Sequence, residues 1–515
     1  MASVSTVAEK SRGYVLCLAD VVFLLAALAV LRVGQHSLLD DPGLGWHLRN
    51  IDAMLQQRGW LTHDPFTDPR AESPPRWLSN QWLGELPFYL GWKWAGLEGI
   101  TLVNALVIAL LCRCLYLRLL NDTQNWSLAL LWTVLALMGT SCSWNARPNL
   151  FTILFLFYTA DLCMRLHQER VGWSERIALV VLFAVWANTH GGFLAGLMTL
   201  GITLLIEGAY SVVAPTAELR RQALRRTTEL TGLCSACSAA TLVNPYGIGL
   251  YSWVLGLLGD RYFMDLHLEW LSPDFRAAGA MRFEILFLLL PAVLALSSRR
   301  CTLVEIGLCV LWLHQALTGF RYVALWVVVV VPILARCSVQ IDLLNDLAHR
   351  WHIGTSPSSL FHTPQGYSPW WATLLITVVL AGWAHLAQGT FARHDQKAIA
   401  SQAMDRLISE ARRWQQARGE RPVIFHSYDW GGYLTWHGWP ELLNWIDDRN
   451  EVQGKERIAQ YLAILRAEPG WQNHLRNIQF VCIPPTTPLA RSLLAMPEIW
   501  HVHYQDEYAI VFERR

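Results

Sequence analysis

Charged residues are scarce in this chain. Only 16% of its 515 residues are Asp, Glu, Lys or Arg, against roughly 25% in soluble domains, and 53% are hydrophobic. This shortage excludes an ordinary soluble protein and indicates a membrane protein with many spans. The formal net charge is only +1 and no strong basic patch stands out, which argues against nucleic acid as a partner.

Disulfide and processing signals are missing as well. Most of the 11 cysteines lie inside apolar runs, where they act as small packing residues. The predicted exported part contains one cysteine, Cys482, so no disulfide can form inside it. Lys10 and Arg12 precede the first apolar run as in a signal peptide, but no small-x-small cleavage site follows it. We therefore expect an uncleaved first span.

Long apolar runs recur along most of the chain. A helix needs about 20 mainly apolar residues to cross a bilayer. Segment 248–258 is shorter and is predicted to be re-entrant or interfacial. Segment 80–95 is amphipathic and rich in tryptophan, which predicts a helix lying in the membrane interface. By this measure the sequence predicts about eleven spans, near residues 14–33, 98–119, 125–142, 150–167, 176–190, 193–213, 229–243, 283–298, 302–318, 322–336 and 369–388.

Basic residues in the short loops set the predicted orientation, because cytoplasmic loops carry an excess of Lys and Arg. The N-terminus is then cytoplasmic, and everything after residue 389 lies outside. The loops predicted to face outside are 36–97, 144–149, 188–192, 244–282 and 319–321.

The composition changes from apolar to polar after about Gln388. The sequence therefore predicts a polytopic α-helical membrane domain over residues 1–389, with a first outer loop at 36–97. A small extracytoplasmic α/β domain over 390–515 follows it. Strands are predicted at 422–426, 443–447 and 480–483, helices at 456–466 and 488–494, and a hairpin from 501–504 and 508–512.

Polar residues with chemical potential gather on the predicted outer side. Asp41, His47 and Arg49 follow the first span at the membrane boundary, where such groups are costly and are rarely without a role. A phosphate leaving group needs positive charge, and an attacking hydroxyl needs a carboxylate base. Glycosyl transfer from a lipid-phosphate sugar needs both at the membrane surface. The residues concerned are Asp40, Asp41, His47, Arg49, His63, Asp64, Arg147, His190, Asn244, Arg261, His267, Glu269 and Arg321.

Three motifs in this outer loop carry a family resemblance. Segments 41–49 (DPGLGWHLR), 58–67 (RGWLTHDPFT) and 77–85 (WLSNQWLGE) resemble the first outer loop of GT-C fold integral-membrane glycosyltransferases. The likeness is greatest to the bacterial branch related to dolichyl-phosphate-mannose mannosyltransferases and aminoarabinose transferases. Segments 188–193, 243–247 and 446–451 fit the same branch, so in layout the resemblance extends over nearly the whole chain.

The resemblance implies an inverting transferase in a bacterial cytoplasmic (inner) membrane, with a polyprenyl-phosphate sugar donor. The acceptor is an unknown glycan, lipid or protein on the outer side. In that family an acidic residue at the outer end of the first span acts as the base, and this position corresponds to Asp41. Asp64 is a second candidate. From their charge and position we expect substrate contacts from His47, Arg49, Arg147, His190, Asn244, Arg261 and Arg321.

Other interpretations stay open. Asp41 suits the N-cap of a helix near Gly45, Asp64 suits a turn before Pro65, and His190 suits a packed, hydrogen-bonded histidine. Arg147 and Arg321 suit side chains that snorkel to the interface. No certain cofactor is predicted: a divalent metal is conceivable, but no ligand spacing in the first loop is strong enough to predict a site.

Two non-enzymatic functions are the alternatives. A lipid or glycan transporter would need internal repeats or paired charges at the midplane, and neither is evident in the sequence. A non-catalytic membrane scaffold would use residues 390–515 to bind a partner. Asp20, Asp161, Glu207 and Glu305 lie in or near apolar runs, and we expect them to make structural hydrogen bonds.

Overall fold

Apolar helices fill one end of the computed structural model, which describes residues 17–33, 38–68, 75–168, 171–341, 370–390, 392–394 and 396–515. Among these residues, five helices are long and apolar enough to cross a membrane, so the chain is a multi-pass membrane protein. They are α3 (Trp82–Thr123), α4 with η1 (Trp126–Ser143), α5 (Asn149–His167), α7 (Phe193–Val213) and η4 with α13 (Phe320–Ser338).

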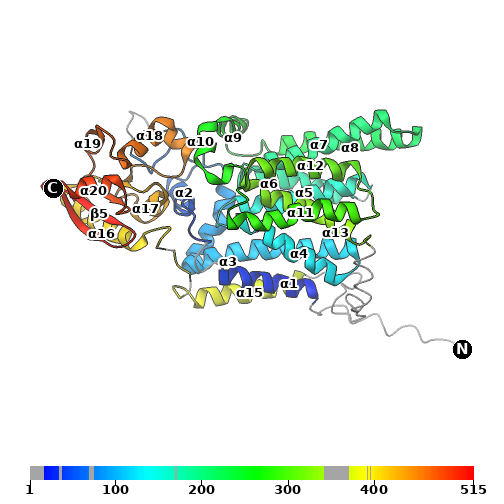
Figure 1. The fold of residues 1–515 in the computed structure, drawn as a ribbon, viewed down its shortest axis with the longest axis horizontal. Helices are drawn as coiled ribbons and strands as arrows, with labels where there is room; N and C mark the ends of the chain where they lie inside the picture. The colour runs from blue at the N-terminus through cyan, green and yellow to red at the C-terminus, as the bar shows by residue number, and fades with distance from the viewer. Residues whose placement is uncertain are drawn as a thin grey trace.

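The other six predicted spans coincide with helices that are shorter or less apolar, so the count of eleven stays a prediction. Predicted residues 14–16, 36–37, 69–74 and 369 lie outside the described part of the chain. The six helices are α1 (Leu18–Val33), α6 (Trp173–Thr189), α8 (Ala217–Ala240), α11 (Met281–Leu296), α12 (Leu303–Thr318) and α15 (Trp370–Leu386). Figure 1 shows them running along the long axis with the five longer helices.

The tryptophan-rich segment before α3's apolar part is a separate helical piece. α3 breaks at Ala95 and Gly96, where Gly96 has a φ of 62° that favours glycine. Beside the break, a Cβ on Gly99 would lie 1.8 Å from the carbonyl oxygen of Gly91. The two pieces therefore pack closer than any other residue would allow, and the first piece turns away from the span.

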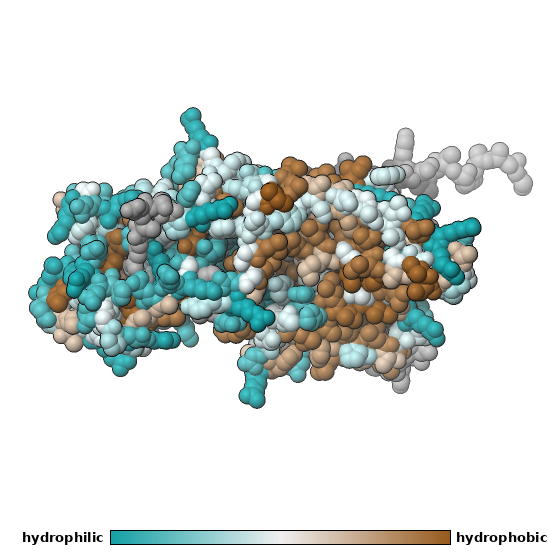
Figure 2. All heavy atoms as spheres, turned by 90° about the horizontal axis from the view of Figure 1, so that it is seen from above, coloured by the Kyte–Doolittle hydropathy of each residue, from teal (hydrophilic) through white to brown (hydrophobic). Residues whose placement is uncertain are grey.

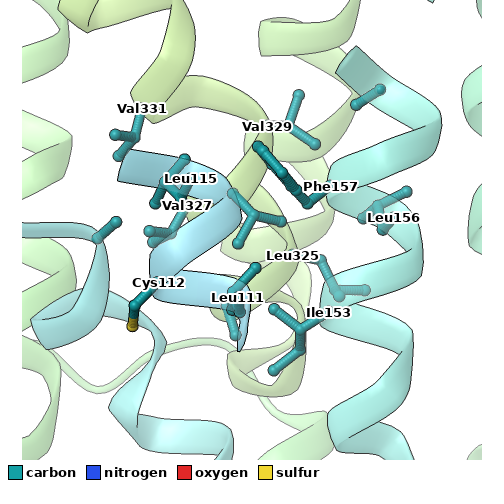
Figure 3. Packing of buried hydrophobic residues seen from close by; sticks show 14 of the residues in the cluster. Leu111, Cys112, Leu115, Ile153, Leu156, Phe157, Leu325, Val327, Val329 and Val331 are labelled. Atoms are coloured by element: carbon teal, nitrogen blue, oxygen red, sulfur yellow. The ribbon is translucent and has the colours of Figure 1, made fainter. Parts of the chain in front are cut away.

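Helix α13 (Val323–Ser338) lies at the centre of the bundle. All of its residues are buried, and it contacts α3, α4, α5, α11 and α12. Its valine-rich face meets Leu111 and Leu115 of α3 and Phe157 of α5 in a continuous apolar core (Figure 3). The neighbours of α13 are thereby fixed around one axis.

Acidic residues inside the bundle are paired with arginines, as their expected structural role predicts. Buried Asp20 lies 3.5 Å from Arg113. Asp161 contacts Arg118 and Arg165 at 2.8 Å each. Such pairing removes the cost of an isolated charge among apolar helices.

Glu207 and Glu305 are paired in the same way. The first contacts Arg226 at 3.0 Å, and the second contacts Arg299 at 2.8 Å and Arg336 at 2.9 Å. All four acids for which the sequence predicts a structural role therefore have arginine partners.

The other end of the molecule is a small α/β unit. Its sheet has the order β2-β1-β3-β5-β4. Strands β2, β1 and β3 are parallel to one another, and β5 is antiparallel to both of its neighbours, β3 and β4. The strands are β1 (Val423–His426), β2 (Leu443–Asn444), β3 (Phe480–Ile483), β4 (Trp500–Gln505) and β5 (Ile510–Arg514). The helices are α16 (Ser401–Arg418), α17 (Gly431–Gly438), α18 (Asn450–Leu465), α19 (Trp471–His474) and α20 (Pro488–Leu494). Figure 2 shows a hydrophilic surface over this unit and an apolar surface over the bundle.

Most of the predicted elements of this unit are confirmed, but some bounds are wrong. β5 spans Ile510–Arg514 instead of 508–512, and β2 stops at Asn444 instead of continuing to Asp447. A turn at Asp447 ends β2 early, because its carboxylate accepts the backbone N–H of Arg449 and a side-chain N–H of Gln453. Helix α18 breaks at Gly454, which has a φ of 72°, so the helix predicted from Glu456 is its second piece and a short first piece from Asn450 precedes it.

Residues 66–68 of the first loop complete the edge of the sheet. The backbone N–H of Asn444 donates to Phe66, and that of Asp68 donates to Asn444, so the loop runs beside β2. Arg449 then joins the two parts through fully buried ion pairs, 2.9 Å to Asp64 and 2.6 Å to Asp447. The loop and the α/β unit therefore share one polar core.

We expect Arg449→Met to destabilise the junction strongly, because it leaves two carboxylates buried without their cation. Breaking a buried pair in this way costs about 3–5 kcal/mol. Thermal unfolding and limited proteolysis of the detergent-solubilised protein would measure the loss. The matched control is Arg413→Met, which removes an exposed pair with Glu410 and should cost at most about 1 kcal/mol. Equal stability of the two variants would contradict the proposed junction.

Candidate active site

A polar cavity of about 210 Å³ lies where the bundle, the first loop and the α/β unit meet. Helices α2 (Leu44–Gln57) and α10 (Arg261–Leu266) occupy this boundary in Figure 1. The walls come from segments far apart in the sequence. They include Pro42, Trp46, His47, Gln81, Arg147, Asn149, His190, His267, Glu269, Trp270, Arg321, Tyr428, Asp429, Asp448, Arg449, Asn450 and Glu451.

Arg147 is the central cation of the cavity. It lies in the short connection before α5, forms an ion pair with Asp41, and contacts Glu269 at 3.3 Å. Burial disfavours its charge, but the carboxylates of Asp41 and Glu269 outweigh burial and raise the pKa of Arg147. The guanidinium is therefore charged and held from both sides.

Arg321 stands beside it, just before α13. Its guanidinium lies 3.9 Å from the ring centre of Trp270 and 3.6 Å from the carboxylate of Glu269. Burial works against ionisation of Glu269, yet Arg321 and Arg147 prevail and lower its pKa. One carboxylate thus separates two cations that would otherwise repel each other.

His190 supplies a neutral donor on the same wall. Its Nδ1 accepts from the backbone N–H of Gly192 at 3.0 Å and lies 3.0 Å from the hydroxyl of Thr152. With Nδ1 occupied as an acceptor, a neutral ring carries its proton on Nε2. His190 is therefore a hydrogen-bonded, packed histidine, and it also lines the cavity.

Carboxyl groups from the α/β unit line the same cavity. Asp448 accepts a hydrogen bond of 2.8 Å from the indole N–H of Trp46. Burial, followed by the charges of Asp447 and Asp41, raises the pKa of Asp448 to about 8. Burial also raises the pKa of Asp429 and of Glu451. Asp448 can therefore be protonated at neutral pH, whereas Arg147 stays charged.

His47 lines the cavity from α2. Its Nδ1 lies 2.8 Å from a carboxylate oxygen of Glu85, which also contacts Asn50. Burial, then the nearby Arg147, lowers the pKa of His47 well below its usual value. The ring is therefore neutral, and Glu85 fixes its orientation.

The two predicted bases have different surroundings. Asp41 is fully buried and is not among the residues that line the polar or the apolar cavity. Its Oδ1 accepts from the backbone of Gly43 at 2.8 Å, and its Oδ2 pairs with Arg147, which does line the polar cavity. Helix α2 begins at Leu44 with Gly43 as its N-cap and no side-chain cap bond, so the expected capping role of Asp41 is wrong. Asp64 is buried against Arg449 and lines neither the polar nor the apolar cavity.

Three predicted substrate contacts lie away from the cavity. The Arg49 guanidinium donates to the carbonyls of Trp436 and Trp439 at 2.6 and 2.7 Å, so it ties α2 to the α/β unit. Asn244 braces its own turn by donating to Thr241 at 2.8 Å. Arg261 is exposed at the start of α10 and lines neither cavity. The residue types of these three suited a substrate contact, but the direction of a side chain is a property of the tertiary structure.

A second cavity of about 230 Å³ adjoins the first and is mostly apolar. The residues that line both are Gln81, Asn149, His190, Leu257, Trp270, Arg321 and Glu451. Its apolar lining comes from α5, α7, α9 (Gly249–Gly259), α12 and α13, with Ile153, Leu194, Ala195, Met198, Trp253, Val254, Leu257, Leu258, Trp312 and Leu325. An amphipathic ligand could place its polar head in the first cavity and its apolar tail in the second.

Within the described ranges, no group of three or more His, Cys, Asp or Glu side chains could hold a metal ion. The titratable cavity residues that the sequence does not predict are Tyr428, Asp429, Asp448, Arg449 and Glu451. Asp448 directly follows the second predicted strand, and no pattern in the sequence marks it as a cavity residue.

No family model matches the sequence, and no curated protein is similar enough to match it. Solved structures match in fold. AglB, the archaeal oligosaccharyltransferase from Archaeoglobus fulgidus, in complex with an inhibitory peptide and a dolichol-phosphate, has a TM-score of 0.56 at 11% identity, over 97% of this chain and 74% of its own. The apo form of the A. fulgidus oligosaccharyltransferase has a TM-score of 0.54 at 10% identity, over 90% of this chain and 69% of its own.

A third structure, the A. fulgidus enzyme tethered to an acceptor peptide containing the NVT sequon, has a TM-score of 0.54 at 11% identity, over 97% of this chain and 74% of its own. Identity this low establishes the fold alone. The chain has the GT-C fold of these membrane proteins, as the first-loop motifs predict. The particular bacterial branch stays a prediction.

Two glycines hold the cavity walls together. A Cβ on Gly45 of α2 would lie 2.0 Å from the carbonyl oxygen of Gly432 in α17, and a Cβ on Gly432 would lie 2.0 Å from that of Pro42. Both contacts are with backbone, which cannot swing aside. Trp46 and His47 reach the cavity because this approach is so close.

We expect Gly45→Ala to separate α2 from α17 and to lower the unfolding midpoint, because overpacking costs about 1–3 kcal/mol. Differential scanning fluorimetry in detergent would measure the change. Gly201→Ala is the control, because nothing lies within 4 Å of a Cβ there and the site is helical. It should leave the midpoint unchanged or raise it. An unchanged midpoint in Gly45→Ala would rule out the tight contact.

Proposed function

We propose that this protein is a membrane glycosyltransferase that moves a sugar from a polyprenyl-phosphate donor to an acceptor outside the cytoplasmic membrane. The observation that carries the proposal is that one polar cavity holds both cations and a carboxyl group. Arg147, Arg321 and the neutral His190 line it together with Asp448. A transfer with an anionic leaving group and a protic nucleophile needs both kinds of group in one place.

The phosphate of the donor binds beside Arg147 and Arg321. Arg147 and Arg321 lie on either side of Glu269, and His190 can add an N–H from Nε2. Guanidinium groups bind phosphate through charge-assisted hydrogen bonds. Glu269 keeps the two cations in place until the phosphate takes over part of its role.

The first isoprene units of the donor occupy the apolar cavity. That cavity begins at His190 and Arg321, where the phosphate binds, and it is lined mainly by aliphatic and tryptophan side chains. An isoprenoid chain gains roughly 25 cal/mol per Å² of apolar surface removed from water. The sugar then projects into the polar cavity, toward the carboxyl groups.

The reaction is an inverting displacement at the anomeric carbon. The acceptor oxygen attacks from the face opposite the phosphate, its O–H bond breaks, and the proton passes to a carboxylate. The bond between carbon and phosphate oxygen breaks, and its electron pair leaves with the polyprenyl phosphate. Asp41 and Asp448 are the candidate proton acceptors.

The proposed setting is the outer face of a bacterial inner membrane, with a cytoplasmic N-terminus and an extracytoplasmic α/β unit. Two features support it. Basic residues concentrate in the alternate loops, and the A. fulgidus neighbours are described with a dolichol-phosphate and with an acceptor peptide. These ligands support a lipid-phosphate donor for a chain of this fold. The acceptor here is a glycan, a lipid or a protein.

We expect Arg321→Gln to weaken binding of polyprenyl phosphate about 10- to 100-fold, since a hydrogen bond to a charged group is worth about 1.5–3 kcal/mol. Native mass spectrometry and titration of the nanodisc-reconstituted protein with synthetic polyprenyl phosphate would measure it. Arg261→Gln is the matched control, because Arg261 is exposed and outside both cavities. Wild-type affinity in Arg321→Gln, or equal losses in both variants, would count against the proposed phosphate site.

A further inference from the structure

Two neighbouring acidic residues have opposite surroundings. Asp447 is fully buried, and its oxygens accept hydrogen bonds from Arg449 and Gln453. Asp448 is partly exposed and lines the polar cavity. The carboxyl of Asp447 is engaged in structural hydrogen bonds, whereas the carboxyl of Asp448 is accessible to a ligand in the cavity.

One oxygen of Asp448 is free to act. Oδ1 accepts from the indole of Trp46 at 2.8 Å. Oδ2 has no hydrogen-bond donor among the residues that the structure describes, and a Cβ on Gly43 would lie 3.1 Å from it. The same Cβ position is 3.1 Å from Oδ1 of Asp41, so the two carboxyls face each other across Gly43.

Asp41 lacks such an open oxygen. Its side chain has no exposed surface, and its two oxygens accept from Gly43 and pair with Arg147. Both oxygens of Asp41 are therefore already engaged, and neither is presented to the cavity. An acceptor in the cavity would meet Asp448 before it could meet Asp41.

We propose that Asp448 is the catalytic residue that takes the proton from the acceptor, and that Asp41 is a positioning residue that holds Arg147 for the donor phosphate. This inference rests on the proposed glycosyl transfer. In the step, the acceptor's O–H proton moves to Oδ2 of Asp448 as the new glycosidic bond forms. The electrons of the broken bond leave on the phosphate oxygen, beside Arg147 and Arg321.

The electrostatic surroundings suit this task. Burial and the charges of Asp447 and Asp41 raise the pKa of Asp448, while Arg147 and the Trp46 hydrogen bond oppose the rise. A base with a pKa near the working pH accepts protons most effectively. Because only the ionised form can accept, turnover should increase as the pH rises through about 8. The titratable and charged groups that line the cavity with Asp448 or act on it electrostatically are Asp41, His47, Arg147, His190, His267, Glu269, Arg321, Tyr428, Asp429, Asp447, Arg449 and Glu451.

The first test measures release of polyprenyl phosphate from synthetic polyprenyl-phosphate hexoses by the full-length protein in nanodiscs. Asp448→Asn should lower kcat by about 100-fold or more, with little change in donor KM. Asp448→Glu should restore part of the rate. Asp41→Asn should raise donor KM and move the acidic limb of the pH profile to lower pH, because a charge that raises the pKa of Asp448 is gone. Glu456→Gln removes an exposed carboxylate from α18 and should change nothing.

The second test needs no donor, so it separates failure of this inference from failure of the proposed function. A hydrophobic carbodiimide reacts with accessible protonated carboxyls, and peptide mapping should find Asp448 modified and Asp41 unmodified. Added polyprenyl phosphate should protect Asp448. Modification of Asp41 alone would overturn the assignment. Wild-type kcat in Asp448→Asn, or a wild-type rate that does not rise between about pH 6 and about pH 9, would overturn it as well.

Discussion

The cavity depends on one buried cation. Arg449 holds Asp64 of the first loop and Asp447 of the α/β unit in fully buried ion pairs, and its guanidinium also lies 4.4 Å from the ring centre of Trp77. Neither carboxylate could stay in that position without it, since an unpaired buried charge is far more costly than a paired one. The loop is thereby fixed against the sheet. This fixed position brings Trp46 into contact with Asp448.

A second consequence of this junction is the separation of charge within the cavity. Arg147 and Arg321 approach from the bundle, whereas Asp448, Asp429 and Glu451 approach from the α/β unit. Each group is stabilised on its own side, the cations by Glu269 and the acid by the Trp46 indole. Opposite chemical roles can thus coexist within a cavity of about 210 Å³ without neutralising each other.

The sequence was informative where the signal is local. The pattern of apolar residues located β3 and α20 with correct bounds, and the acidic residues among apolar runs were correctly taken as structural. It also selected Arg147, His190 and Arg321, which lie in short connections between helices and line the polar cavity. These predictions needed only spacing and polarity.

The rest depended on contacts that spacing cannot reveal. Trp46 and Asp448 are 402 positions apart, so no local pattern distinguishes Asp448 from the buried Asp447 beside it. Arg49 has the charge and the sequence position expected of a substrate contact, but its guanidinium donates to backbone carbonyls of the α/β unit. A side chain's role at this site is decided by which distant segment folds against it.

The central helix has an implication for how the protein is made. Because every residue of α13 is buried, this helix has no surface of its own to offer to lipid. The arginine before it pairs with Glu269, and Arg336 near its end pairs with Glu305. Both acids precede α13 in the chain, so during synthesis from the N-terminus they emerge from the ribosome before it. The central helix is therefore synthesised after the partners that pair with its two ends.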